Sequence, residues 1–179
     1  NALLAVTLAF MSIPSTVITV PLFLMYSKIG LVGTPWAVII PQLATPFGLY
    51  LMIIYAQTSI PVSLIEAAKL DGASTWTIFW KVGFPLLSPG FVTVLLFTLV
   101  GVWNNYFLPL IMLSDTNDYP LTVGLNMWLK MGAQGTANGQ VPNNLIITGS
   151  LIAVVPLIIA FMFLQKYWQS GLAAGSVKQ

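Results

Sequence analysis

The sequence contains only four carboxylate side chains that could take part in acid-base chemistry. They are Glu66, Asp71, Asp115 and Asp118, and all four lie in segments that we expect to be loops. The sequence has no histidine and no cysteine. It therefore offers no imidazole base, no thiol nucleophile, no disulfide and no thiolate or imidazole metal site. We expect no catalytic residues, no bound metal and no cofactor, which argues against an enzyme.

A second group of side chains is suited to binding. Trp103, Asn104, Asn105 and Tyr106 are consecutive and combine aromatic faces with amide donors and acceptors. This mixture suits a sugar, which stacks on aromatic rings and forms many hydrogen bonds. An equally open interpretation is that the two asparagines hold a helix kink or a subunit interface, because amides within a membrane often serve packing.

The elements that carry these residues are predicted to cross a membrane. Of 179 residues, 58% are hydrophobic and 6% are charged, against about a quarter charged in a soluble domain. A helix needs about 20 apolar residues to cross the hydrocarbon core. Four stretches without any charge are long enough: residues 1–27, 29–65, 82–114 and 131–165. The six lysines form no run that could follow a nucleic-acid backbone, so nucleic acid is an unexpected partner.

We expect an all-α bundle of four spans at about residues 2–25, 36–55, 89–113 and 145–165. Prolines at 14, 21, 41 and 46 indicate kinked or broken helices in the first two. In the fourth span, Gly149 and Ala153 share a stripe of small residues that would let another helix approach closely.

The lysines predict the orientation. The segment 56–88 and the tail 166–179 hold four lysines, whereas the opposite side holds Lys28 and Lys130, so the first side is predicted to be cytoplasmic. The loop 114–144 is then extracytoplasmic and contains a short amphipathic stretch from Leu121 to Leu129. The chain begins with Asn1 inside an apolar stretch, so we expect it to be truncated at its N-terminus.

The cytoplasmic segment 59–88 is predicted to form a helix, a tight turn and a second helix. Ser59 could cap the first helix, which would run to about Leu70, and Gly72 suits the left-handed residue of the turn. Ser74 could cap the second helix, which we expect Pro85 to stop. From these features alone, a passive connector and a docking element are equally good interpretations.

One motif in this segment resembles a known family. Glu66-Ala67-Ala68, then Gly72 after three residues, then Val82-Gly83-Phe84-Pro85 after nine more, resembles the EAA signature of ATP-binding cassette importer permeases. Further stretches resemble the MalG-type subunits of carbohydrate importers and extend the likeness over nearly the whole chain. They are PLFLMYSKIGL at 21–31, WNNYFLPL at 103–110 and the tail from Leu164.

The resemblance implies a function for the EAA loop. It implies that the loop is a coupling helix docked on a cytoplasmic ATPase, with Glu66, Ala67, Ala68, Asp71 and Gly72 as coupling residues. ATP would be hydrolysed by that partner, since the chain has no Gly-rich phosphate loop of its own.

The resemblance also implies an assembly in a bacterial or archaeal cytoplasmic membrane. Its parts are a second homologous permease subunit, two ATPase subunits and an extracytoplasmic solute-binding protein that delivers a sugar. This chain would supply four spans of a six-span permease. The tail would make a secondary contact with the ATPase through Gly171, Gly175 and Lys178, although a frayed end is the alternative.

A different class of function stays open from the residues alone, namely an ion-coupled secondary transporter or channel subunit. Proton or voltage coupling normally leaves ionisable groups within the spans, and the four predicted spans contain none. The loop 114–144 is our candidate for contact with the binding protein, and residues 136–144 are the part expected to be most exposed.

Overall fold

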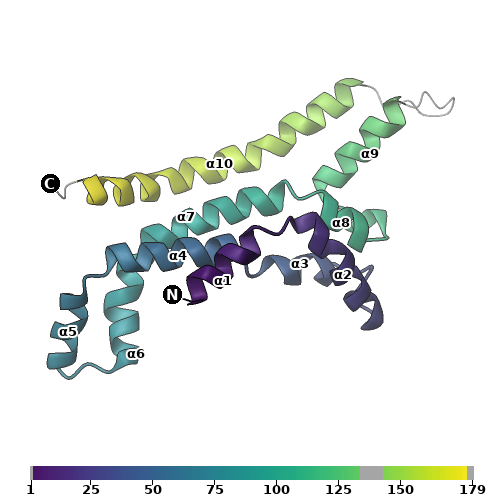
Figure 1. Cartoon of the computed structure of the whole chain (residues 1–179). Coiled ribbons are helices and arrows are strands. Elements are labelled where there is room, and N and C mark those ends of the chain that lie inside the picture. The colour runs from purple at the N-terminus through teal and green to yellow at the C-terminus, as the bar shows by residue number, and fades with distance from the viewer. Residues whose placement is uncertain (1, 134–142, 177–179) are drawn as a thin grey trace. The chain divides into compact units, whose positions relative to one another are not determined.

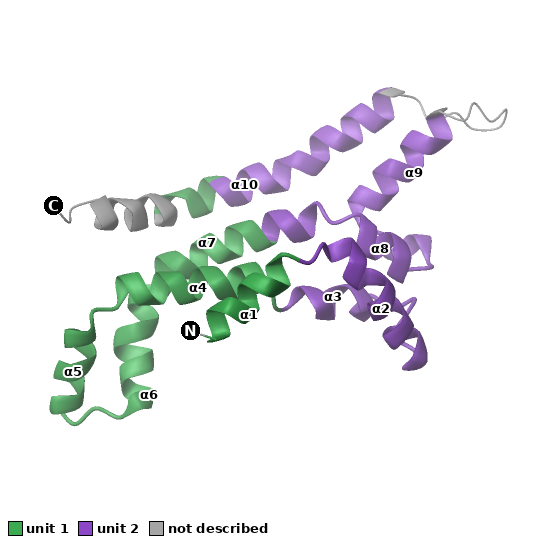
Figure 2. Ribbon diagram, in the orientation of Figure 1, with its two compact units in different colours: residues 1–12, 44–98, 162–179 green, residues 13–43, 99–161 purple. Residues whose placement is uncertain are grey.

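The computed structural model describes the backbone of residues 2–133 and 143–176 (Figure 1), with side chains for residues 2–132 and 144–166. Every regular element within these ranges is helical, as predicted. The elements are α1 (Ala2–Met11), α2 (Ser15–Lys28), α3 (Trp36–Gln42), α4 (Pro46–Ser59), α5 (Val62–Leu70), α6 (Thr75–Ile78), the π-helix η1 (Phe79–Gly83), α7 (Phe84–Trp103), α8 (Phe107–Met112), the 3-10 helix η2 (Thr116–Asp118), α9 (Leu121–Ala133) and α10 (Asn143–Ser176). They divide into two compact units (Figure 2). Unit 1 comprises residues 1–12, 44–98 and 162–179, and unit 2 comprises residues 13–43 and 99–161.

Prolines lie at the interruptions between α1 and α2 and between α3 and α4. Pro14 ends the gap between α1 and α2 and has an extended backbone, with φ of −59° and ψ of 133°. Thr45 caps α4 by accepting a hydrogen bond from the backbone N–H of Gly48 at 3.1 Å, and Pro46 follows in the first turn, where its missing N–H costs nothing. The prolines inside helices, such as Pro21 and Pro156, are accommodated without a break.

Close approach of α4 and α7 holds unit 1 together. A Cβ atom built on Gly90 would lie 2.8 Å from Cδ1 of Tyr55, so only glycine fits at this crossing. The rings of Phe47 and Phe97 meet edge to face at 5.5 Å, and α1 packs along α4. Small residues and aromatic contacts, which suit packing without a hydrophobic driving force in lipid, therefore define this unit.

The core of unit 2 forms around Tyr26, Ala37 and Met112, which are almost completely buried. The turn between α2 and α3 reaches this core because Gly33 adopts a positive φ of 86° and donates its N–H to the carbonyl of Met112 at 2.8 Å. A Cβ on Gly149 would lie 2.8 Å from Cδ2 of Leu125, so α9 and α10 pack closely at the predicted small-residue stripe.

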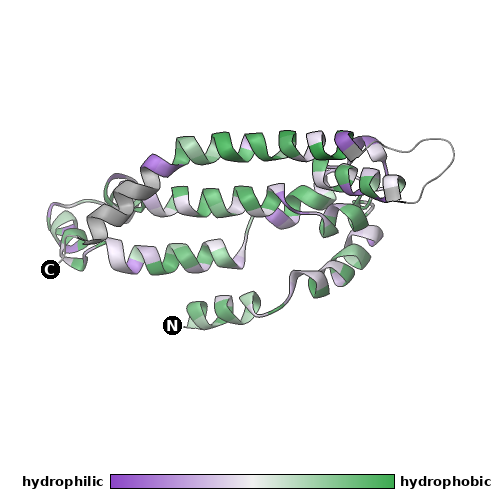
Figure 3. Cartoon of the chain, turned by 90° about the horizontal axis from the view of Figure 1, so that it is seen from above, coloured by the Kyte–Doolittle hydropathy of each residue, from purple (hydrophilic) through white to green (hydrophobic). Residues whose placement is uncertain are grey.

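Among the described residues, three helical segments are long and apolar enough to cross a membrane: Trp36–Ser59, Thr75–Trp103 and Asn144–Lys166. The pair α1 and α2 qualifies only if both are counted as one span, because each helix alone is too short. Figure 3 shows how apolar residues dominate these segments. In the most apolar window of Asn144–Lys166, no residue is buried within the chain, as expected for a helix surrounded by lipid or by other subunits.

Candidate functional site

The predicted helix, turn and helix lies between α4 and α7 in unit 1. Its first helix is α5, which begins after Pro61 and presents an exposed face that includes Glu66 and Ala67, whereas Ala68 is half-buried. Leu70, at the end of α5, has 89% of its surface exposed. The prediction that Ser59 caps this helix is wrong, because Ser59 is the last residue of α4 and Pro61 occupies the cap position.

The turn after α5 has the geometry of a Schellman motif. Gly72 has a φ of 76°, its N–H donates to the carbonyl of Lys69 at 3.0 Å, and the N–H of Ala73 donates to the carbonyl of Ala68 at 3.0 Å. Ser74 then caps α6 by accepting a hydrogen bond from the N–H of Thr77 at 3.2 Å. Both predictions for the turn, the left-handed Gly72 and the Ser74 cap, are confirmed.

The second helix of the loop continues directly into the membrane segment. We expected Pro85 to stop it, and this expectation is wrong, since Thr75–Trp103 is one helical segment of 29 residues. Proline removes an N–H donor and its ring clashes with the carbonyl four residues earlier. Here the five-residue π-helix η1 precedes Pro85, and the N–H of Phe84 donates to the carbonyl of Phe79, five residues back. The wider turn accommodates the proline without a break.

The four binding candidates lie in unit 2, where Trp103 is the last residue of α7 and residues 104–106 form the interruption before α8. Trp103 ends α7 and donates its indole N–H to the carbonyl of Ala153 at 3.0 Å. Tyr106 donates its hydroxyl to Oδ1 of Asn126 at 3.1 Å. Asn104 is exposed and donates its amide only one turn back, to the carbonyl of Val100.

Asn105 is the most heavily bonded residue of this group. Its Nδ2 donates to Oε1 of Gln42 at 3.2 Å, and its Oδ1 accepts from the N–H of Leu108. Its backbone carbonyl accepts from the hydroxyl of Thr122 on α9 at 2.9 Å. Among the described side chains, no buried nitrogen or oxygen lacks a hydrogen-bond partner. Asn105 therefore joins α3, α8 and α9, and the arrangement of this residue favours the packing interpretation.

Comparison with known proteins identifies the chain. Residues 1–173 match the family described as "Binding-protein-dependent transport system inner membrane component". The chain belongs to this family. Its all-helical fold is that of these inner membrane components, as the sequence predicted.

Named relatives support this membership. AraQ of Halalkalibacterium halodurans, a permease protein of an arabinooligosaccharide transport system, is 32% identical over 99% of this chain and 61% of AraQ. MelC of Bacillus subtilis, a melibiose, raffinose and stachyose import permease, is 33% identical over 99% of this chain and 63% of MelC. The crystal structure of a bacterial ABC transporter involved in the import of alginate matches with a TM-score of 0.69 and 29% identity, over 92% of this chain and 59% of that chain. The chain thus spans about three fifths of the length of these relatives.

Sequence reasoning missed three members of the polar network in this inner membrane component: Gln42, Thr122 and Asn126. Gln42 carried a signal, because it is an amide between two prolines of an apolar stretch, where an unpaired polar group would be costly. Thr122 and Asn126 lie in the segment that we treated only as an amphipathic stretch. They share one face of α9 at a spacing of four residues, which the sequence could have indicated.

Some predicted positions fall outside what the structure describes. The backbone of α10 is helical as far as Ser176 and so includes Gly171 and Gly175, but the structure does not describe their surroundings. Lys178 and the larger part of the segment 136–144 lie outside the described residues.

Proposed function

We propose that this chain is part of a membrane-spanning permease subunit of an ATP-binding cassette importer. In this proposal, a separate ATPase binds the exposed face of α5 and drives alternation between inward-facing and outward-facing states. The observation that carries the proposal is the construction of the loop. An exposed helix, fixed by a Schellman turn, continues through α6 and η1 into a segment long enough to cross the membrane.

The surface of α5 has the chemistry that a protein partner requires. Leu70 presents a nearly bare apolar side chain, Ala67 permits close approach, and Glu66 offers a carboxylate to a cation on the partner. Asp71 and Gly72 set the end of the helix. Exposed apolar side chains rimmed by charge are typical of an interaction site.

Helical continuity supplies the route for motion. A displacement of α5 reaches the membrane through the short turn at residues 71–74 and then through a single helical segment. A helix is stiff along its axis, whereas a break at Pro85 would have inserted a flexible joint. The π-helix η1 preserves the connection, and π-helical turns are frequent at functional sites.

For the substrate we propose a sugar or oligosaccharide. The relatives named above transport arabinooligosaccharides or melibiose, raffinose and stachyose. Within the three candidate membrane segments, the only charged residues are Lys81 and the terminal Lys166, as suits an uncharged solute. Of the four binding candidates, Asn104 is the one whose exposed amide is available for a solute. Trp103, Asn105 and Tyr106 would shape the path while their polar atoms hold helices together.

The remaining parts of the assembly are proposed from the same family membership. They are a second homologous permease subunit, two ATPase subunits on the cytoplasmic side and a solute-binding protein on the other side. The loop 114–144 would meet the binding protein, and the tail with Gly171, Gly175 and Lys178 would meet the ATPase.

The experiment that tests this function is uptake of labelled oligosaccharide into proteoliposomes that contain the complete transporter. We expect uptake to require ATP on the ATPase side and loaded binding protein on the other. Uptake that requires a proton or sodium gradient and does not depend on ATP would instead support an ion-coupled secondary transporter. A non-hydrolysable ATP analogue serves as the control, because it permits binding without turnover.

A further inference from the structure

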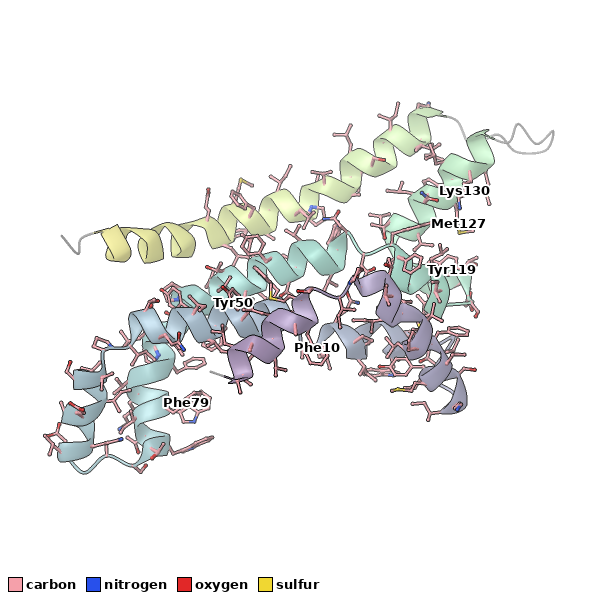
Figure 4. The ribbon with its side chains drawn as sticks, viewed as in Figure 1. Phe10, Tyr50, Phe79, Tyr119, Met127 and Lys130 are labelled. Carbon is pink, nitrogen blue, oxygen red and sulfur yellow. The ribbon has the colours of Figure 1, made fainter. Side chains whose placement is uncertain are left out.

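Five aromatic side chains form a continuous ladder along the outer surface of α6, η1 and the beginning of α7. They are Trp76, Phe79, Trp80, Phe84 and Phe91, and the centroids of contacting rings are 5.1 to 6.5 Å apart. Figure 4 labels Phe79 within this group. The π-helix helps to form the ladder, because its wider turn brings Phe84 into contact with both Phe79 and Trp80.

The ladder is exposed along its whole length. The exposed fraction rises from 38% at Phe91 to 48% at Trp80 and 71% at Trp76. Aromatic rings that only packed a helix hairpin would turn toward α5. These rings contact one another and keep a large part of their surface exposed, which is typical of an interaction site.

The position of the ladder relative to the membrane indicates what that surface is. The 20 residues of α7 span about 30 Å, which is the thickness of the hydrocarbon core. A core that coincides with α7 would place Phe84 at its edge, Phe91 within it and Trp80 about one helical turn beyond the edge, at the depth of the lipid headgroups. Tryptophan prefers this depth because its ring is apolar and its N–H is polar.

The charge in this segment agrees with a lipid surface. Lys81 follows Trp80 directly and is exposed, and its ammonium group can meet the phosphates of anionic headgroups. The described part of the segment Thr75–Trp103 has no carboxylate that would repel those phosphates. The ladder is also continuous with exposed apolar side chains of α7, such as Leu86 and Leu95.

We propose that the lipid headgroup layer is the partner of this ladder, with Phe79, Trp80 and Phe84 seated in it, Phe91 among the acyl chains and Trp76 at its outer edge. The ladder anchors the base of the coupling loop at a fixed depth. Motion of α5 then turns the membrane helix about this anchored point and does not push the helix along its axis.

The test uses a photoreactive aromatic residue, p-benzoylphenylalanine, in place of Trp80. The complete transporter is reconstituted in vesicles of phosphatidylethanolamine and phosphatidylglycerol and irradiated, and the captured molecules are identified by mass spectrometry. We expect lipid adducts at Trp80, several-fold more than with the same probe at Ile78, which is 8% exposed on the same helix. A probe at Phe84 repeats the measurement if the Trp80 variant does not assemble.

The same probe at Leu70 separates this inference from the proposed function. Capture of the ATPase at Leu70 supports the coupling role of α5, whatever the result at Trp80. Capture of the ATPase or of the second permease subunit at both Trp80 and Phe84, without lipid, would overturn the lipid anchor and leave the proposed function standing.

Discussion

The side-chain amide of Asn105 donates a hydrogen bond to Oε1 of Gln42 at 3.2 Å. This contact links the interruption between α7 and α8 to the end of α3, just before the interruption between α3 and α4. Helix interruptions expose backbone and side-chain polar groups, which are costly in an apolar environment unless they are paired. The pair therefore satisfies polar groups at the end of α3 and in the interruption before α8, both of which lie in unit 2.

The first prediction is that Gln42 and Asn105 are energetically coupled. Gln42→Leu and Asn105→Leu should each lower the stability of the protein in detergent, and the double variant should be less destabilised than the sum by about 0.5 to 1.5 kcal/mol. Thermal unfolding of the four proteins measures this coupling. Strict additivity would mean that the hydrogen bond contributes nothing to stability.

The second prediction separates the two asparagines. Asn104 is exposed and bonds only to the carbonyl of Val100 in its own helix, so Asn104→Leu should change stability by less than about 0.5 kcal/mol. If Asn104 lines the solute path, the variant should nevertheless reduce transport. Asn105→Leu provides the comparison, with a larger loss of stability. Equal destabilisation by both substitutions would contradict the difference in their surroundings.

The third prediction concerns the crossing of α4 and α7. Gly90→Ala should destabilise the protein by about 1 to 3 kcal/mol, because the new Cβ atom would lie 2.8 Å from the ring of Tyr55. Tyr55→Ala should relieve the overlap and restore part of the lost stability in the double variant. Gly101→Ala is the matched control, since a Cβ there meets no atom within 4 Å and the substitution favours a helix.

The fourth prediction concerns the turn of the coupling loop. A Cβ on Gly72 would meet no atom within 4 Å, so the effect of Gly72→Val arises from its φ of 76° alone. The left-handed conformation should cost about 1 to 2 kcal/mol and loosen the connection between α5 and α6. Faster proteolysis within residues 71–74 would reveal this, and Gly72→Asn should be milder because asparagine tolerates this conformation. A cleavage rate identical to that of the unmodified protein would refute the strain.

Local signals allowed several parts of the structure to be predicted from sequence. Gly72 and Ser74 have short-range roles, one through its backbone conformation and the other through a side-chain cap, and both are read from the residues themselves. Charge-free apolar stretches likewise predicted the long helices. These features depend on a few neighbouring residues, so no knowledge of the tertiary structure was needed.

Sequence reasoning was wrong or left alternatives open where the structure depends on interactions that no local pattern shows. Pro85 is typical of the end of a helix, but the π-helical turn before it accommodates the proline. No pattern in the sequence predicted that turn. Asn105 could have been a solute ligand or a packing residue, and its hydrogen bond to Gln42 was needed to favour the second.

The most direct test of the central claim is the ATPase rate of the reconstituted transporter with Glu66→Lys. We predict that stimulation by loaded binding protein falls by about tenfold or more, because the reversed charge meets a cation on the ATPase, while the subunits still insert. Lys28→Glu also reverses a charge, at the exposed end of α2 and outside the segments assigned to a partner, and should leave stimulation intact. Full stimulation and unchanged transport in Glu66→Lys would contradict coupling through α5.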